Sequence, residues 1–157
     1  MTLYAKDIMV TNFEIIRMET PIEEAILKIS SGIVRETGYK TISLMVIDDF
    51  NKLCGIISMF DILYHLRPGF LNFGIDSEGL EWGGQLKILI DKFKGKKVSH
   101  IMSRNVVEAA MNDHIMILLD RMVKHKYRRL PILDNGKPVG VVYISDIYHR
   151  LFSQQMM

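Results

Sequence analysis

Two aspartates at the start of predicted helices are the first candidates for chemistry in this chain. Asp61 lies three residues after Ser58, and Asp146 lies three residues after Tyr143. Each aspartate follows an apolar β-branched stretch and precedes a helical apolar pattern. A carboxylate at the start of a helix can accept hydrogen bonds from both hydroxyls of a ribose cis-diol, and the free N–H groups of the helix favour a nearby anion. The pattern suits a ribose-containing ligand.

The same spacing also has a structural interpretation. Ser58 and Asp61 match a capping box, in which the serine caps the helix and the acid lies in its first turn. Tyr143 is a poor helix cap, although the neighbouring Ser145 could supply a shifted one. Retention of Asp146 without the usual capping partner favours a ligand role for this residue.

Cations that could meet a phosphate gather ahead of a strand in the second half of the chain. They are Lys124, His125, Lys126, Arg128 and Arg129. Adjacent side chains on a strand point to opposite faces, so only one of Arg128 and Arg129 can enter a given cleft. The alternative is a solvated helix end with cations placed favourably by the helix dipole. The first half has Ile42 and Ser43 at the corresponding positions.

Other chemistry has little support. The five histidines are dispersed, with no pair at the i, i+4 spacing of a helical metal site: His65, His100, His114, His125 and His149. No nucleophile elbow, Walker loop or dinucleotide glycine fingerprint occurs. We therefore predict that the chain holds no metal.

Composition is that of an ordinary globular protein. The chain has 157 residues, of which 48% are hydrophobic and 24% charged, and a chain of this size can bury roughly 70% of its unfolded surface. A net charge of +2 is too small to imply a nucleic-acid or membrane partner by itself. The single cysteine, Cys54, fits a reducing, cytoplasmic setting. With no signal peptide and no run of 18 apolar residues, we predict a soluble protein.

An internal repeat organises the chain. The stretch that begins at Gly55 returns at Gly140 with an offset of 85, and the strand that begins at Leu44 returns at Leu130 with an offset of 86. Near the start, Asp7-Ile8-Met9 returns as His100-Ile101-Met102 with an offset of 93. Offsets that stay constant over each motif indicate two homologous halves.

Each half is predicted to fold as β-α-β-β-α. In the first half, Thr20 and Glu23 form a capping box around Pro21 for a helix to about Glu36, after a strand at 13–18 and before strands at 41–47 and 53–57. In the second half, Asp113 caps a helix to about Lys126, after a strand at 106–107 and before strands at 129–133 and 139–142. Asn135-Gly136 predicts a two-residue hairpin turn.

A connector separates the halves. Its first part is rich in glycine and contains Pro68, which predicts a loop. Its second part places Trp82, Leu86, Leu89, Ile90 and Phe93 on one helical face. We interpret this helix as an amphipathic connector that packs on the domain or on a dimer mate, with a nucleic-acid contact as the alternative.

These motifs together resemble a tandem of CBS domains, which is called a Bateman module. The resemblance rests on the paired Asp/His-Ile-Met openings, the strands Leu-Met-Val-Ile-Asp and Leu-Pro-Ile-Leu-Asp, and the two Gly-h-h-x-x-x-Asp endings. It implies an α/β (α+β) fold of two repeats packed about a pseudo-two-fold axis. We predict repeat 1 at 1–66, a loop and connector helix at 67–96, repeat 2 at 97–152 and a tail at 153–157.

The resemblance implies a non-catalytic binding module with two clefts for adenosine-containing ligands. The ribose-binding Ser/Thr-x-x-Asp motif of the family matches Ser58 and Asp61, whereas Tyr143 replaces the hydroxyl residue ahead of Asp146. A basic residue directly ahead of the Leu-Pro strand often faces the phosphates of the ligand, and Arg128 and Arg129 occupy that place here.

We therefore expect a regulatory module, not an enzyme, with no catalytic cofactor. It would sense AMP, ADP, ATP or S-adenosylmethionine, form a homodimer with the shape of a flat disk, and signal to a separate effector protein, with no membrane partner. Two alternatives stay open. One is a structural dimerisation module with vestigial clefts, and the other is a nucleic-acid-associated regulator that uses the basic stretch 92–97, whose binding would fall steeply with salt.

Overall fold

Helices and strands follow one another in the same order in both halves of the chain. The structure is a computed structural model and describes residues 2–32, 43–69 and 82–153. Within these ranges, each half has a short helix followed by a strand, a helix, two strands and a helix. This order confirms the predicted mixed α and β fold with two β-α-β-β-α repeats.

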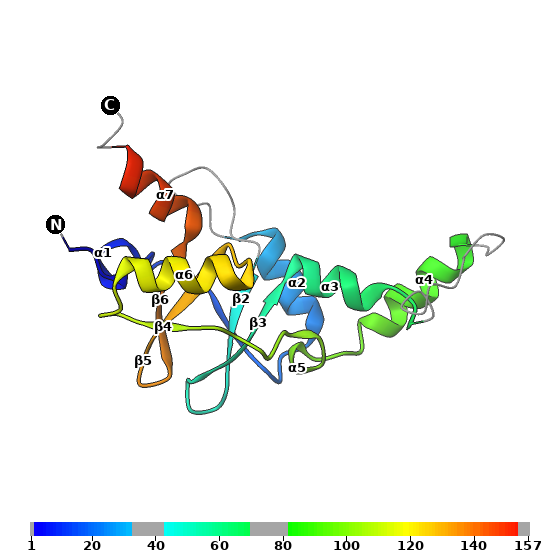
Figure 1. The fold of residues 1–157 in the computed structure, drawn as a ribbon. Helices are drawn as coiled ribbons and strands as arrows, with labels where there is room; N and C mark the ends of the chain where they lie inside the picture. Colours follow the sequence, from blue (N-terminus) through cyan, green and yellow to red (C-terminus); the bar gives the residue numbers. More distant parts are fainter. Residues whose placement is uncertain (1, 33–42, 70–81, 154–157) are drawn as a thin grey trace. The chain divides into compact units, whose positions relative to one another are not determined.

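The chain divides into two compact units, which differ from the two halves of the sequence (Figure 1). Unit 1 comprises Met1–Glu14, Asp48–Leu53 and Asn105–Met157, and unit 2 comprises Ile15–Ile47 and Cys54–Arg104. We call residues 1–14 and 96–104 the opening segments of the first and the second repeat. Each opening segment thus belongs to the unit that holds the sheet of the other repeat. The domain boundaries predicted from the sequence divide the repeats along the chain instead, and they stay a prediction.

Unit 2 is built on a sheet with the strand order β1-β2-β3, in which β1 runs parallel to β2. Its strands are β1 (Ile15–Arg17), β2 (Ser43–Ile47) and β3 (Leu53–Ser58), and its helices are α2 (Ile22–Ser30), α3 (Met59–Leu66), α4 (Trp82–Phe93) and α5 (Val98–Ile101). Ile22, Ala25 and Ile29 share the buried side of α2 because they recur at helical spacing. They pack with Val46 and Ile57 of the sheet in one core cluster.

Unit 1 repeats this plan with the strand order β4-β5-β6, in which β4 is parallel and β6 antiparallel to β5. Its strands are β4 (Ala109–Ala110), β5 (Arg129–Asp134) and β6 (Lys137–Tyr143), and its helices are α1 (Ala5–Ile8), α6 (Ile115–His125) and α7 (Ile144–Phe152). The predicted hairpin turn is confirmed, because Asn135 and Gly136 have φ angles of 52° and 81°. The core packs Leu118 and Met122 of α6 against Leu130 and Val142 of the sheet.

The opening segments join their units through backbone hydrogen bonds. In unit 1, Val10 N donates to Val141 O at 2.8 Å and Val141 N donates to Val10 O at 3.0 Å. In unit 2, Ser103 N donates to Ile56 O at 2.8 Å and Ile56 N donates to Ser103 O at 3.0 Å. Each opening segment therefore pairs with the strand that leads to the aspartate motif of the other repeat.

The starts of α2 and α6 also use these opening segments, and both predicted side-chain caps are wrong. Pro21 is the N-cap of α2 without a side-chain bond, and Ile22 N donates to Lys96 O at 2.9 Å. The corresponding bond in unit 1 runs from Ile115 N to Leu3 O, also at 2.9 Å. A backbone carbonyl from the opening segment thus satisfies a helix N–H group that would otherwise need a cap.

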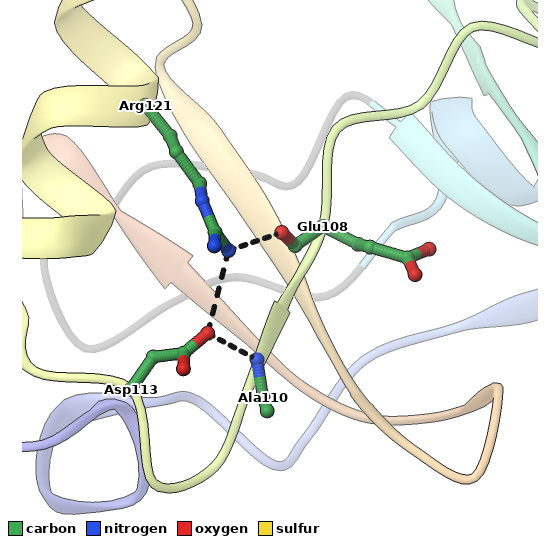
Figure 2. Close-up of polar contacts among 4 residues, drawn as sticks. All are labelled: Glu108, Ala110, Asp113 and Arg121. Atoms are coloured by element: carbon green, nitrogen blue, oxygen red, sulfur yellow. Dashed lines mark hydrogen bonds and ion pairs between the residues drawn. The ribbon is translucent and has the colours of Figure 1, made fainter.

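Asp113 binds an arginine instead of capping α6 (Figure 2). Its Oδ2 atom accepts from Ala110 N at 2.9 Å and lies 3.3 Å from Nη1 of Arg121, which also donates to Glu108 O at 2.8 Å. The cap of α6 is His114, whose Nδ1 accepts from Met116 N at 3.1 Å. The Arg121 contacts hold α6 over the segment that forms β4.

Two further boundaries differ from the sequence prediction. The first strand of the second half is at Ala109–Ala110 and not at 106–107, because that is where the chain pairs with β5. Helix α2 ends at Ser30, where the hydroxyl of Ser31 donates to Leu27 O at 2.7 Å and competes with the helical ladder. The remainder of the predicted helix extends into residues 33–42, which lie outside the described ranges.

Candidate functional site

Ser58 and Asp61 form a complete capping box at the start of α3. The Ser58 hydroxyl accepts from Asp61 N at 3.2 Å and donates to Asp61 Oδ2 at 2.9 Å. The same Oδ2 atom accepts from Ser58 N at 2.9 Å. The capping box that the spacing of Ser58 and Asp61 predicted is therefore formed, and one oxygen of the Asp61 carboxylate takes part in it. Among the described residues, Asp61 Oδ1 has no hydrogen-bond partner.

Asp146 lies in a different environment at the start of α7. The N-cap residue, Tyr143, provides no side-chain cap bond and is buried, with 7% of its surface exposed. The shifted cap at Ser145 is not formed, because the helix already begins at Ile144. Within the described part of the chain, the half-buried carboxylate of Asp146 accepts no hydrogen bond. Both of its oxygens are therefore available for another partner.

The two arginines lie beside the strand end that leads to Asp146. Arg129 is the first residue of β5 and is the cross-strand partner of Tyr143. The carbonyl oxygen of Arg128 accepts from Ile144 N at 2.9 Å. Arg128 lies just before β5 and is exposed, whereas Arg129 is half-buried.

The six predicted site residues fall into two groups. Tyr143, Asp146, Arg128 and Arg129 belong to unit 1, whereas Ser58 and Asp61 belong to unit 2. In unit 1, the carboxylate of Asp146 can accept from ribose hydroxyls, and a guanidinium can donate to phosphate oxygens. In unit 2, Ser43 is the first residue of β2, the place that Arg129 has in β5, so that position carries no charge.

The methionines that pack against Gly140 and Gly55 are not among the residues predicted for the site. Met9 lies against Gly140 in unit 1, and Met102 lies against Gly55 in unit 2. The sequence did contain a signal for them, because Ile8-Met9 returns as Ile101-Met102 with the offset of 93 that the two opening motifs share. Residues of the opening segments thus pack against the strands that lead to both candidate groups.

The described ranges contain neither a cluster of metal-binding side chains nor a membrane-spanning helix. Residues 2–32, 43–69 and 82–153 contain no cluster of three or more histidine, cysteine, aspartate or glutamate side chains that could hold a metal ion. No helix in these ranges combines the length and the apolar character that crossing a membrane requires.

Known proteins resemble the chain in sequence and in fold. One curated relative, the zinc metalloprotease MJ0392 of Methanocaldococcus jannaschii, is 34% identical over 98 residues, which are 62% of this chain and 27% of that protein. The chain thus spans about a quarter of the length of this relative.

Solved structures share the fold at low sequence identity. CBSX2 in complex with AMP has a TM-score of 0.68 at 24% identity, with 98% of this chain and 99% of that chain covered. The CBS domain pair of MJ0100, in complex with 5′-methylthioadenosine and S-adenosyl-L-methionine, has a TM-score of 0.65 at 24% identity and covers 99% of each chain. A CBS domain from Sphaerobacter thermophilus has a TM-score of 0.69 at 21% identity, covering 94% of this chain and 86% of that one.

The CBS domain family matches two segments, residues 5–68 and 98–153. These segments contain all six candidate site residues and leave the connector between them unmatched. Because they make up most of the sequence and coincide with the two structural repeats, the chain belongs to the CBS domain family.

Proposed function

We propose that this chain is a non-catalytic regulatory module that binds an adenosine-containing ligand and signals to a separate protein. The observation that carries the proposal is the group in unit 1, where Arg129 pairs with Tyr143 and Asp146 follows with a carboxylate that no described residue engages. The AMP complex of CBSX2 and the S-adenosyl-L-methionine complex of MJ0100 support this ligand class. The single cysteine, Cys54, fits a reducing cytoplasmic setting.

The two groups are proposed to bind unequally. In unit 1, Asp146 would accept from the ribose hydroxyls and an arginine would meet a phosphate. In unit 2, Asp61 has one oxygen in the capping box, and Ser43 stands where Arg129 stands in unit 1. Phosphate-bearing ligands should therefore prefer the unit 1 group. Ligand binding changes the state of an effector only to the extent that two arrangements of the module differ in affinity for the ligand.

The direct test is calorimetric titration of the chain with AMP, ADP, ATP and S-adenosylmethionine. Asp146→Ala should weaken binding of every ligand that binds, because the ribose is common to all of them. Arg129→Ala should weaken AMP more than adenosine if its guanidinium meets the phosphate. Arg128→Ala is the matched control, because it removes the same charge from the exposed residue just before β5. Absence of binding by all four ligands would refute the sensor function.

A second proposal concerns a homodimer, and α3 carries it. No residue of α3 is buried, and it exposes Met59, Phe60, Leu63 and Tyr64 at 46%, 75%, 55% and 47% of their surfaces. A helix that is apolar on more than one side needs a covering partner. In the other unit, α7 exposes Tyr148 and Phe152. We propose that these helices meet a second copy of the chain.

Sedimentation velocity of Phe60→Asp tests this second proposal. The wild-type chain should sediment as a dimer, and the variant should shift toward the monomer. His65→Asp, an exposed substitution on the opposite side of the same helix, is the control. A chain that dimerises but binds none of the four ligands would be a structural dimerisation module with vestigial clefts.

A further inference from the structure

The connector helix α4 is held to unit 2 mainly at its C-terminal end (Figure 1). Phe93 is 5% exposed and belongs to the core cluster of unit 2. Closer to the N-terminal end, Leu86, Ile88 and Ile90 are 51%, 50% and 38% exposed. The helix lies between the two segments that match the CBS domain family.

Positive charge is concentrated in this helix and its C-terminal extension. Residues 82–96 contain Lys87, Lys92, Lys94 and Lys96 but only one acid, Asp91, which gives a formal charge of +3. The whole chain carries +2, so the remaining residues together carry −1. Within the described residues, the four lysines form no ion pair. Lys97 is not counted here because it pairs with Glu19 at 2.9 Å.

Exposed apolar and cationic side chains lie close together on α4 and the turn that follows it, next to the position of Phe93 on the helix circumference. Leu86 and Ile90 are four residues apart, and Lys87 and Lys94 border them. At 3.6 residues per turn, these four positions fall within about 100° of the helix circumference. Exposed aliphatic groups beside lysines match a surface that has anionic groups at its face and an apolar interior. A nucleic-acid backbone would use the lysines but leave Leu86 and Ile90 without a partner.

We propose that α4 is a peripheral binding helix for an anionic lipid surface. The lysines meet the headgroups, and Leu86 and Ile90 enter the boundary of the acyl region. The small net charge of the chain does not argue against this partner, because the relevant charge is local to α4. This binding function is separate from the adenosine-ligand groups, and it does not depend on them.

The chain provides its own probe, because Trp82 is its only tryptophan and is the first residue of α4. The full chain is mixed with vesicles made of equal parts of phosphatidylglycerol and phosphatidylcholine. The expected result is co-sedimentation with the vesicles, a shift of tryptophan emission to shorter wavelength, and a loss of both as salt is raised. Vesicles of phosphatidylcholine alone should bind much less.

Two sets of variants separate the contributions of charge and apolar contact. Lys87→Glu with Lys94→Glu should lower binding by about tenfold or more. Lys124→Glu with Lys137→Glu makes the same charge change on exposed residues of unit 1 and should bind more tightly than the α4 variant. Leu86→Gln with Ile90→Gln should lower binding with no change of charge, and circular dichroism verifies that the variants remain folded.

Three results would overturn the proposal. The first is no binding of the wild-type chain to the anionic vesicles at low salt. The second is equal loss of binding in the α4 variant and in its control. The third is salt-dependent binding to duplex DNA without binding to vesicles, which would assign the α4 lysines to nucleic acid.

Discussion

Met9 packs directly against Gly140 and leaves no room for a side chain on that residue. A Cβ atom at position 140 would lie 2.7 Å from Met9 Sδ. In unit 2, a Cβ atom at Gly55 would lie 2.7 Å from Met102 Sδ and 2.8 Å from the carbonyl oxygen of Ser103. The glycine that leads each aspartate motif is therefore required by the opening segment that packs on it.

Gly140→Ala is expected to lower the free energy of unfolding by about 1–3 kcal/mol, the usual cost of overpacking a filled site. The obstruction comes from the side chain of Met9, so Met9→Ala should relieve much of this cost. Urea denaturation of both single variants and the double variant measures the coupling. If the two costs simply add, the Met9 contact is not the cause.

Gly55→Ala should be harder to relieve, because the obstruction includes the backbone oxygen of Ser103. Met102→Ala in the same chain should recover less stability than Met9→Ala recovers for Gly140→Ala. Gly84 in α4 serves as the control, since a Cβ atom there meets nothing within 4 Å. Gly84→Ala should stabilise the chain by about 0.5–1 kcal/mol through helix propensity.

The two aspartates should respond differently to removal. Asp61→Ala breaks the capping box and should cost about 0.5–2 kcal/mol in the free energy of unfolding. Ser58→Ala breaks the same box, so the double variant should cost less than the sum. Asp146→Ala removes no hydrogen bond to a described residue and should change stability by no more than about 0.5 kcal/mol. A large loss of stability in Asp146→Ala would indicate a structural role.

Arg121 should contribute more to stability than an ordinary surface cation. Its guanidinium binds Glu108 O and Asp113 Oδ2 while 38% of the side chain remains exposed, so we expect Arg121→Met to cost about 1 kcal/mol after allowance for solvent screening. Lys124→Met, which breaks the exposed pair with Asp120, should cost only about 0.3–0.5 kcal/mol. Thermal denaturation compares them, and equal costs would mean that the Arg121 contacts add little.

Glu19 should titrate below the usual range for a glutamate. The hydrogen bond from Lys97 and the charge of Lys97 lower the pKa of Glu19, with a smaller contribution from His100. A depressed carboxyl pKa means that the pairing stabilises the fold above the ordinary glutamate range and that this contribution is lost as the pH falls through the folded-state pKa. Titration by NMR should show the Glu19 pKa rising in Lys97→Ala. An unchanged pKa would mean that the ion pair does not persist in solution.

Local sequence patterns predicted the order of elements well, because helical spacing, strand alternation and the Asn135-Gly136 turn act over a few residues. They failed at Thr20 and Asp113, where a partner distant in sequence decides the outcome. Lys96 O satisfies the first N–H group of α2, and Arg121 takes up the Asp113 carboxylate. Sequence alone does not reveal which repeat an opening segment joins, because both repeats offer the same glycine and the same apolar strand.

At the candidate site, the sequence suggested residues whose ligand role stays a prediction, and it did not reveal their hydrogen bonds. The spacing of Ser58 and Asp61 fits both a cap and a ligand site, and only coordinates show that the cap is formed. Arg129 lies opposite Tyr143 because the pairing of β5 with β6 shifts by one residue between Ile132 and Leu133. The Asn135-Gly136 turn alone would place Arg129 opposite Val142, so the sequence did not reveal this pairing.

The pairing of Val10 with Val141 has a consequence for synthesis on the ribosome. All of unit 2 lies within residues 15–104, so its sheet and both of its chain segments have been made when less than three quarters of the sequence has emerged. Unit 1 needs both the first residues and β6. Residues 1–14 therefore have no strand to pair with until β6 has been translated. Residues 1–14 are thus made before unit 2 but reach their final positions only after β6 has been made.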